Sequence, residues 1–121
     1  MNEKNEEHRE EEFDPQVQSF TLILHAGNSK SSAMEAIAAA NAGDYQKAED
    51  KLKEADEELT EAHQAQTDLL VRMSRGESIP VDVLMVHAQD HLNAASIIST
   101  MAKQLIAVQK ELAELKEKIS G

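Results

Sequence analysis

Two histidines and an aspartate lie within five residues of one another in the stretch MVHAQDHLNAAS: His87, Asp90 and His91. On an α-helix, residues three or four apart share a face, so His87 faces both of the others. Three kinds of chemistry fit this arrangement: histidine metal ligands beside a carboxylate, general acid–base catalysis, or a nucleophilic imidazole that receives a group. A plain surface or packed histidine fits the same residue types.

The place of His87 in its helix favours a phosphorylated imidazole over a plain surface histidine. Gly, Ser and Pro in RGESIP, residues 75–80, predict a turn, and either Ser78 or Asp82 is a candidate N-cap for the helix that follows. His87 then lies in the first or second turn, near free N–H groups and the positive end of the helix dipole. That field stabilises a phosphoryl dianion and keeps the ring neutral, with a nitrogen free for attack.

Other catalytic classes find little support in the sequence. Ser96 is nine residues from His87, and neither a glycine-flanked nucleophile turn nor a phosphate-binding glycine loop is present. A closed zinc site needs more ligands than this segment supplies, because His25 and His63 belong to other predicted helices and the chain has no cysteine.

Composition predicts one small helical domain. The chain has 121 residues and a formal net charge of −11, which disfavours nucleic acid or an anionic membrane as a partner. It has three aromatic residues, so the core must consist of Ala, Leu, Ile, Val and Met, which favours helices. Neither a signal peptide nor a membrane-spanning run is visible, and a cytoplasmic location is the expectation.

The apolar period predicts an all-α, antiparallel up-down-up bundle of three helices. Residues 1–14 form an acidic, flexible tail, and residues 15–121 form the domain. Asp14-Pro15 begins the first helix, Ala42-Gly43-Asp44 is a tight turn into the second, and the third runs to the C-terminus. The first helix has its main apolar stripe at Val17, Phe20, Leu24, Gly27, Ser31, Met34 and Ala38.

The first and third helices carry more apolar residues than one stripe requires. In the first, Leu22, Ile23, Ala33 and Ile37 widen the apolar face. Three helices cannot bury all of this surface, and a surplus apolar patch on a small protein usually marks association. Self-association through a helical face is therefore expected.

The segment Met85–Leu92, MVHAQDHL, resembles the VHAQDHL signature of the enzyme IIA component of the lactose/cellobiose class in the bacterial sugar phosphotransferase system. LHAGNS at 24–29 with MEA at 34–36 resembles the first helix of that family, and AHQAQTDL at 62–69 resembles its AHxxQTxLL pattern. The resemblance covers about residues 16–118.

This resemblance implies a homotrimer, a nine-helix assembly in which a histidine of each subunit accepts a phosphoryl group from phospho-HPr and passes it to a cysteine of enzyme IIB. The matching histidine is His87, phosphorylated on its outer nitrogen, Nε2. Asp90 matches an acidic residue that meets its symmetry mates on the trimer axis around a divalent cation such as Mg²⁺. Gln89 and His91 match family positions and are candidate donors to the phosphoryl oxygens; His91 alternatively packs in the bundle.

The sequence departs from the family pattern at Asn93-Ala94 and at Met73-Ser74-Arg75, and neither change touches His87 or Asp90. The resemblance further implies an indirect link to a membrane permease, enzyme IIC, which makes most of the choice of sugar; a β-linked disaccharide or oligosaccharide is expected. The alternative hypothesis is a non-enzymatic helical scaffold or metal-binding protein, in which His87 is an incidental surface group.

Overall fold

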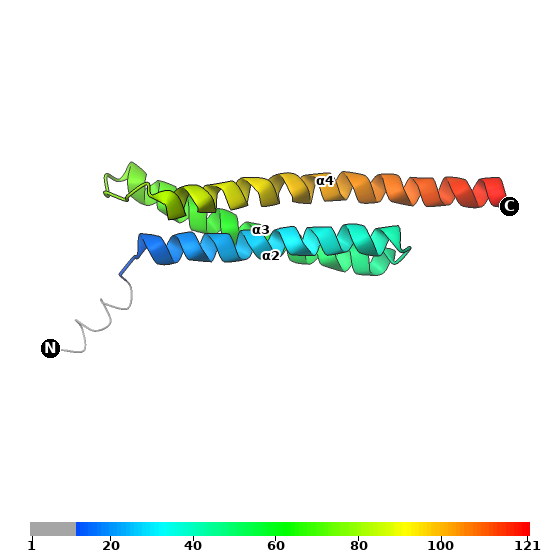
Figure 1. Cartoon of the computed structure of the whole chain (residues 1–121), viewed down its shortest axis with the longest axis horizontal. Coiled ribbons are helices and arrows are strands. Elements are labelled where there is room, and N and C mark those ends of the chain that lie inside the picture. The colour runs from blue at the N-terminus through cyan, green and yellow to red at the C-terminus, as the bar shows by residue number, and fades with distance from the viewer. Residues whose placement is uncertain (1–11) are drawn as a thin grey trace, which may run out of the picture.

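The computed structural model describes residues 12–121 as three long helices joined by two short connections (Figure 1). Helix α2 spans Pro15–Asn41, α3 spans Tyr45–Ser74 and α4 spans Val83–Ser120. Helices α2 and α4 run in the same direction and α3 runs against both, which confirms the predicted all-α, up-down-up bundle. Residues 1–11 of the predicted acidic tail lie outside the described residues.

An aspartate caps each helix at its N-terminus. The carboxylate of Asp14 accepts a hydrogen bond from the N–H of Gln16, that of Asp44 from Lys47, and that of Asp82 from Met85, at 2.9, 3.1 and 2.9 Å. Each bond satisfies a backbone donor that has no partner within its own helix. Asp82, and not Ser78, is therefore the cap of the helix that carries His87.

Two glycines allow the chain to turn between helices. Gly43 and Gly76 follow the ends of α2 and α3 with φ of 83° and 89°, a left-handed conformation that costs glycine little. The longer connection, between α3 and α4, is anchored by Ile79, whose side chain is buried in the same apolar cluster as Met85 and Leu92. The loop therefore holds the start of α4 firmly against the bundle.

Small side chains form most of the core. The fully buried positions repeat every seven residues as Ala48, Ala55 and Ala62 on α3 and as Ala88, Ala95 and Ala102 on α4. Short side chains allow helix axes to approach closely. The contact is close enough for the buried Ser29 hydroxyl of α2 to donate a hydrogen bond of 2.8 Å to the carbonyl of Ala55 on α3.

The large apolar residues of α2 lie mostly outside this core. The predicted main stripe is solvent-exposed in the single chain: Val17, Phe20, Leu24 and Met34 are 55–61% exposed. The residues buried on α2 are Ser19, Leu22, Ala26, Ser29, Ala33, Ala36, Ala39 and Ala40. The sequence correctly indicated a helix with two apolar faces, but the face against α3 and α4 is the one made of small residues.

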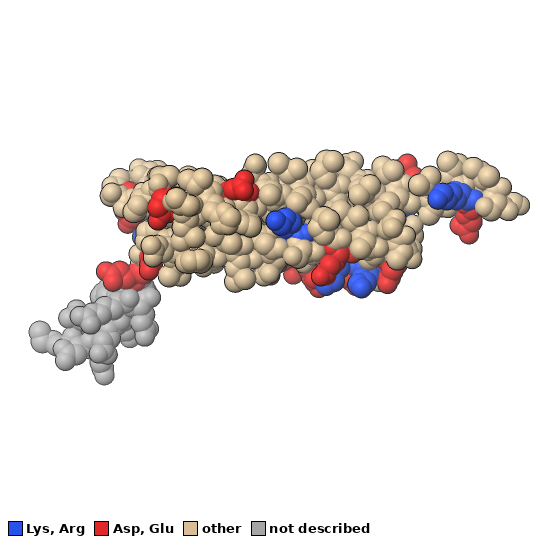
Figure 2. Space-filling view, viewed as in Figure 1, with Lys and Arg blue, Asp and Glu red and all other residues tan. Residues whose placement is uncertain are grey.

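Helix α4 also exposes apolar residues, and it extends past the α2–α3 turn (Figure 1). Ile97, Met101 and Val108 are 56–63% exposed. Figure 2 shows a broad face over α2 and α4 with few charged side chains, whereas Lys, Arg, Asp and Glu gather along other edges. Within residues 12–121 no helix has the length and apolar character needed to cross a membrane.

Candidate functional site

The candidate site lies at the start of α4, where His87 is the fifth residue of the helix. Its backbone position confirms the prediction that it lies within the first two turns. The terminal N–H groups of α4 are partly occupied, because the Asp82 carboxylate accepts from Met85 and its carbonyl accepts from Val86. A group bound to the His87 ring therefore finds the helix dipole there, but not a fully open set of N–H donors.

His87 and His91 are in direct contact. Their Nε2 atoms lie 3.0 Å apart, and the two rings meet edge to face, with centroids separated by 4.4 Å and planes at 84°. A hydrogen bond between these atoms requires that one Nε2 carries a proton and the other presents its lone pair. The His87 residue is exposed and His91 is half-buried, so the pair has an open side and a side packed on the protein.

Asp90 lies one turn from His87 but belongs to a different surface. Among residues 12–121 its carboxylate makes no hydrogen bond or ion pair in the structure. The residues on the same face of α4 are Val86, four positions before Asp90, and Ile97 and Met101, seven and eleven positions after it. All three are more than half exposed. Asp90 is thus an exposed carboxylate set in a stripe of exposed apolar side chains.

Gln89 faces away from His87 and toward α3. Its Oε1 accepts a hydrogen bond of 2.6 Å from Nε2 of Gln66, and its own Nε2 lies 3.7 Å from Sδ of Met85. Both glutamines line a small pocket between α3 and α4, together with His63, Leu92, Asn93 and Ser96. Of the predicted site residues, the structure therefore brings His87 and His91 together and separates Gln89 from them.

The contacts of Gln66 and Met85 with Gln89 were not predicted from the sequence. Gln66 occupies a position in the apolar stripe of α3, where the three-four spacing predicts a core residue. A polar side chain at such a position is a usable signal, because half-buried amides need partners. Its partner on α4 is distant in sequence, so spacing alone cannot identify it.

The other two described histidines do not join the candidate site. His63 is exposed on α3, beside the α3–α4 pocket, and His25 lies between α2 and α3 with its Nδ1 2.6 Å from Oε2 of Glu58. Within residues 12–121 no three His, Cys, Asp or Glu side chains are grouped to hold a metal ion. A metal site within one subunit finds no support in these residues.

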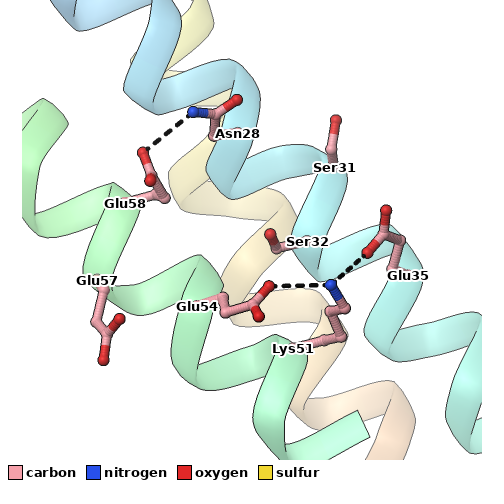
Figure 3. A pocket seen from close by; sticks show the side chains of 8 residues that line it. All are labelled: Asn28, Ser31, Ser32, Glu35, Lys51, Glu54, Glu57 and Glu58. Atoms are coloured by element: carbon pink, nitrogen blue, oxygen red, sulfur yellow. Dashed lines mark hydrogen bonds and ion pairs between the residues drawn. The ribbon is translucent and has the colours of Figure 1, made fainter. Parts of the chain in front are cut away.

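A polar groove between α2 and α3 is occupied by its own ion pairs (Figure 3). The Lys51 ammonium lies 3.0 Å from Glu35 of α2 and 3.1 Å from Glu54 of α3, and Asn28 donates to Glu58 at 3.4 Å. The hydrogen bond to Glu35, followed by that to Glu54, raises the pKa of Lys51 above its ordinary value. These contacts tie the helices together and need no ligand.

Comparison with known proteins places the chain in one family. Residues 17–110 match the family described as "PTS system, Lactose/Cellobiose specific IIA subunit". The chain is 48% identical over 95 residues to the lichenan-specific phosphotransferase enzyme IIA component of Bacillus subtilis, which covers 78% of this chain and 86% of that protein. It is 43% identical over 97 residues to the cellobiose-specific EIIA component of Lactococcus lactis, covering 80% and 84%.

Solved structures agree with this assignment. The cellobiose-specific enzyme IIA of Bacillus anthracis superposes with a TM-score of 0.82 at 36% identity, over 88% of this chain and 97% of that one. PtcA of S. mutans superposes with a TM-score of 0.75 at 43% identity, over 78% and 93%. The resemblance seen in the VHAQDHL stretch is thereby confirmed over most of the chain. The protein belongs to the lactose/cellobiose-specific IIA subunit family of the PTS, the sugar phosphotransferase system, and is one of its phosphotransferase components.

Proposed function

We propose that His87 is a phosphohistidine carrier that takes a phosphoryl group from phospho-HPr and gives it to a cysteine of enzyme IIB. Nε2 of His87 attacks phosphorus, and the P–N bond to the donor histidine breaks. A thiolate of enzyme IIB then attacks the same phosphorus, and the P–N bond to His87 breaks. The observation that carries the proposal is the exposed His87 ring, whose Nε2 is held by Nε2 of His91.

His91 prepares His87 for attack and then stabilises the product. When Nε2–H of His91 donates, Nε2 of His87 holds its lone pair and Nδ1 carries the proton, which is the tautomer that attack requires. The only lone pair of the His87 Nε2 is engaged in this hydrogen bond, so the His91 N–H releases it as the phosphoryl group arrives. Once phosphorus is bound to Nε2 of His87, the same His91 N–H donates to a phosphoryl oxygen. The donor is then paired with a charged acceptor, which makes a stronger hydrogen bond.

Gln89 supports the phosphoryl group of a neighbouring subunit. Gln89 is two positions after His87, so their side chains leave the helix about 160° apart. Its amide lines the pocket between α3 and α4 rather than the space around its own His87. A donor role for Gln89 therefore needs a second copy whose His87 approaches this pocket.

The subunit assembles as a homotrimer of nine helices. Support comes from the exposed apolar stripe of α4 and from the groove beside it, where Met34 of α2 and Met101 and Val108 of α4 lie together. Association removes this surface from water. With three copies arranged around α4, each subunit buries large apolar residues that its own small-residue core leaves outside.

Asp90 is the proposed ligand of a divalent cation on the trimer axis. One chain supplies a single carboxylate on the apolar stripe, so a site requires several copies. Three Asp90 carboxylates fit Mg²⁺, which prefers oxygen ligands, and when bound the cation would compensate their mutual repulsion. It has no part in the phosphoryl transfer steps.

The partners follow from this role. HPr and enzyme IIB are the donor and acceptor, enzyme IIC is linked indirectly, and the subunit works in the cytoplasm. The sugar is a β-linked disaccharide or oligosaccharide, a choice supported by the names of the lichenan- and cellobiose-specific relatives. Because the phosphoryl donor and acceptor are both proteins, this role requires no sugar-binding pocket on the subunit itself.

The competing hypothesis is a non-enzymatic scaffold, and intact mass decides between the two. The protein is incubated with phosphoenolpyruvate, enzyme I and HPr, and wild type is compared with His87→Ala and with His25→Ala, which removes a histidine outside the site. A single acid-labile phosphoryl group on wild type and His25→Ala, and none on His87→Ala, is the expected result. Unmodified wild type that is folded and trimeric would favour the scaffold.

A further inference from the structure

We infer that Gln66 of α3 is a positioning residue that fixes which end of the Gln89 amide is available to a phosphoryl group. The inference rests on the proposed function. It starts from the hydrogen bond between the two amides, which at 2.6 Å joins α3 to α4 across 23 residues of sequence. Both side chains are half-buried, so neither amide exchanges partners freely with water.

An isolated pair of amides has two equivalent arrangements, because either glutamine can be the donor. Met85 removes this equivalence. Its thioether Sδ lies 3.7 Å from the second polar atom of Gln89, and sulfur accepts weakly from an N–H but repels a carbonyl oxygen. Gln66 must therefore donate and Gln89 must accept, which turns the Gln89 NH₂ away from Gln66.

The position of Met85 is itself fixed. Its side chain is buried in the same cluster as Ile79 and Leu92, and its backbone N–H donates to the Asp82 cap. The sulfur cannot move aside without disturbing the start of α4. A chain of contacts thus runs from the cap through Met85 to Gln89, and Gln66 completes it from α3.

The consequence is a preset donor at the wall of the α3–α4 pocket. The Gln89 NH₂ has a weak sulfur partner and retains a hydrogen for an acceptor in the pocket, whereas its carbonyl is occupied by Gln66. Phosphoryl oxygens accept hydrogen bonds and repel carbonyl oxygens. Met85 sets the direction of the pair, and Gln66 holds Gln89 in the orientation that attracts a phosphoryl group.

The test reverses the pair without removing it. In Gln66→Glu the carboxylate only accepts, so Gln89 must turn its NH₂ toward residue 66 and present its carbonyl to the pocket. Gln66→Met leaves Gln89 without a partner but free to donate, and its effect is expected to be smaller. Gln64→Glu is the matched control, because it adds the same charge on exposed surface two residues away.

Two measurements on the full-length protein separate positioning from simple destabilisation. The first is the equilibrium constant for phosphoryl exchange with HPr, read as the phosphorylated fraction of each protein. A hydrogen bond to a charged group sets the scale, and Gln66→Glu is expected to lower the constant by about tenfold or more. The second is the NMR resonance of the Gln89 side-chain NH₂, assigned with Gln89→Met, which is expected to shift in Gln66→Glu and to stay in Gln64→Glu.

The outcomes are distinct. Wild type that takes no phosphoryl group would overturn the proposed function. Phosphorylated wild type with an unchanged constant in both Gln66 variants would overturn the role of Gln66 alone. An equal loss in Gln66→Glu and Gln66→Met, with an unshifted Gln89 resonance in the first, would also overturn it. A larger loss in Gln66→Glu together with the shifted resonance supports it.

Discussion

The Nε2 atoms of His87 and His91 lie 3.0 Å apart on consecutive turns of α4, so the atom proposed to be phosphorylated is already hydrogen-bonded before any phosphoryl group arrives. One proton is shared by two facing nitrogens. When that proton belongs to Nε2 of His91, His87 carries its own proton on Nδ1, and a donor lies next to the P–N bond that forms.

Replacement of His91 is expected to slow phosphoryl transfer more than it destabilises the fold. His91→Leu removes the donor that sets the tautomer of His87, and a lost bond to a charged group corresponds to about a 10- to 100-fold lower rate. His91→Gln retains an N–H donor on a similar scaffold and should recover part of the rate. A time course of phosphorylation by phospho-HPr, read by intact mass, measures the transfer rates of both variants.

The control for this experiment is His25→Leu, which removes a histidine of α2 that lies beside Glu58 and outside the α3–α4 pocket. It should transfer phosphoryl groups at the wild-type rate. Equal rates for wild type and His91→Leu would contradict the role given to His91, whereas equal slowing by His91→Leu and His91→Gln would mean that the hydrogen bond is not what matters.

The close α2–α3 contact predicts a large penalty for a bulky residue at its centre. Ala55 is fully buried, and its carbonyl accepts the Ser29 hydroxyl. Ala55→Leu forces the helices apart and should lower the free energy of unfolding by about 1–3 kcal/mol or more. Urea unfolding followed by circular dichroism measures the change. Ala113→Leu, at an exposed position of α4, should cost less than a third of it; similar costs would argue against a close contact.

The ends of the helices were predictable because local chemistry fixes them. Asp14 and Asp44 act as caps where the sequence places them, and Gly43 supplies the left-handed turn. The choice between Ser78 and Asp82 was not decidable in the same way. Ile79 packs into the core, so the helix begins only after the loop that contains it. This tertiary contact cannot be read from Ser78 or Asp82 themselves.

The apolar faces and the Gln89 contact needed the three-dimensional structure. Periodicity marks where apolar residues lie, but helices that approach closely select small side chains, so Phe20 and Leu24 lie outside while Ala33 is buried. The pairing of His87 with His91 follows from helical spacing alone. The pairing of Gln89 with Gln66 depends on the register between α3 and α4, which spacing along one helix does not encode.

The Lys51 bridge between α2 and α3 is expected to stabilise the fold at neutral pH and to fail at high pH (Figure 3). Glu35 and then Glu54 raise the pKa of Lys51 above its ordinary 10.5. A raised pKa in the folded state means that the stabilisation is complete below the unfolded pKa and is lost as the pH rises through the higher folded value.

Lys51→Met should therefore unfold at a lower temperature than wild type at pH 7, and the difference should shrink as the pH rises above 10.5. Thermal melts at a series of pH values measure it. Lys53→Met is the matched control, because Lys53 is exposed on the same helix and forms none of these ion pairs. If the difference in melting temperature between wild type and Lys51→Met is the same at pH 7 and at high pH, the stabilisation does not come from the Lys51 charge.

The exposed stripe of α4 predicts where a charge disrupts the proposed trimer. Met101 is 63% exposed in the single chain and lines the groove shared with Met34 of α2. Met101→Glu would bury an unpaired carboxylate on association and should shift sedimentation toward monomer, with the helical signal retained. Thr60→Glu places the same charge on exposed α3 surface and should leave the trimer intact. A trimeric Met101→Glu protein would exclude this face from the interface.

Asp90 offers the sharpest test of how the trimer is held together, because it is a carboxylate within an apolar stripe. Three copies brought together without a cation repel one another, so Mg²⁺ should raise the melting temperature of wild type and EDTA should lower it. Asp90→Asn removes the repulsion and the ligand together; it should melt at the same temperature in both buffers, above wild type in EDTA. Asp68→Asn, an exposed carboxylate of α3, should keep the wild-type response. A melting temperature of wild type that ignores Mg²⁺ would rule out the axial cation, and an Asp90→Asn protein that still responds would place the cation elsewhere.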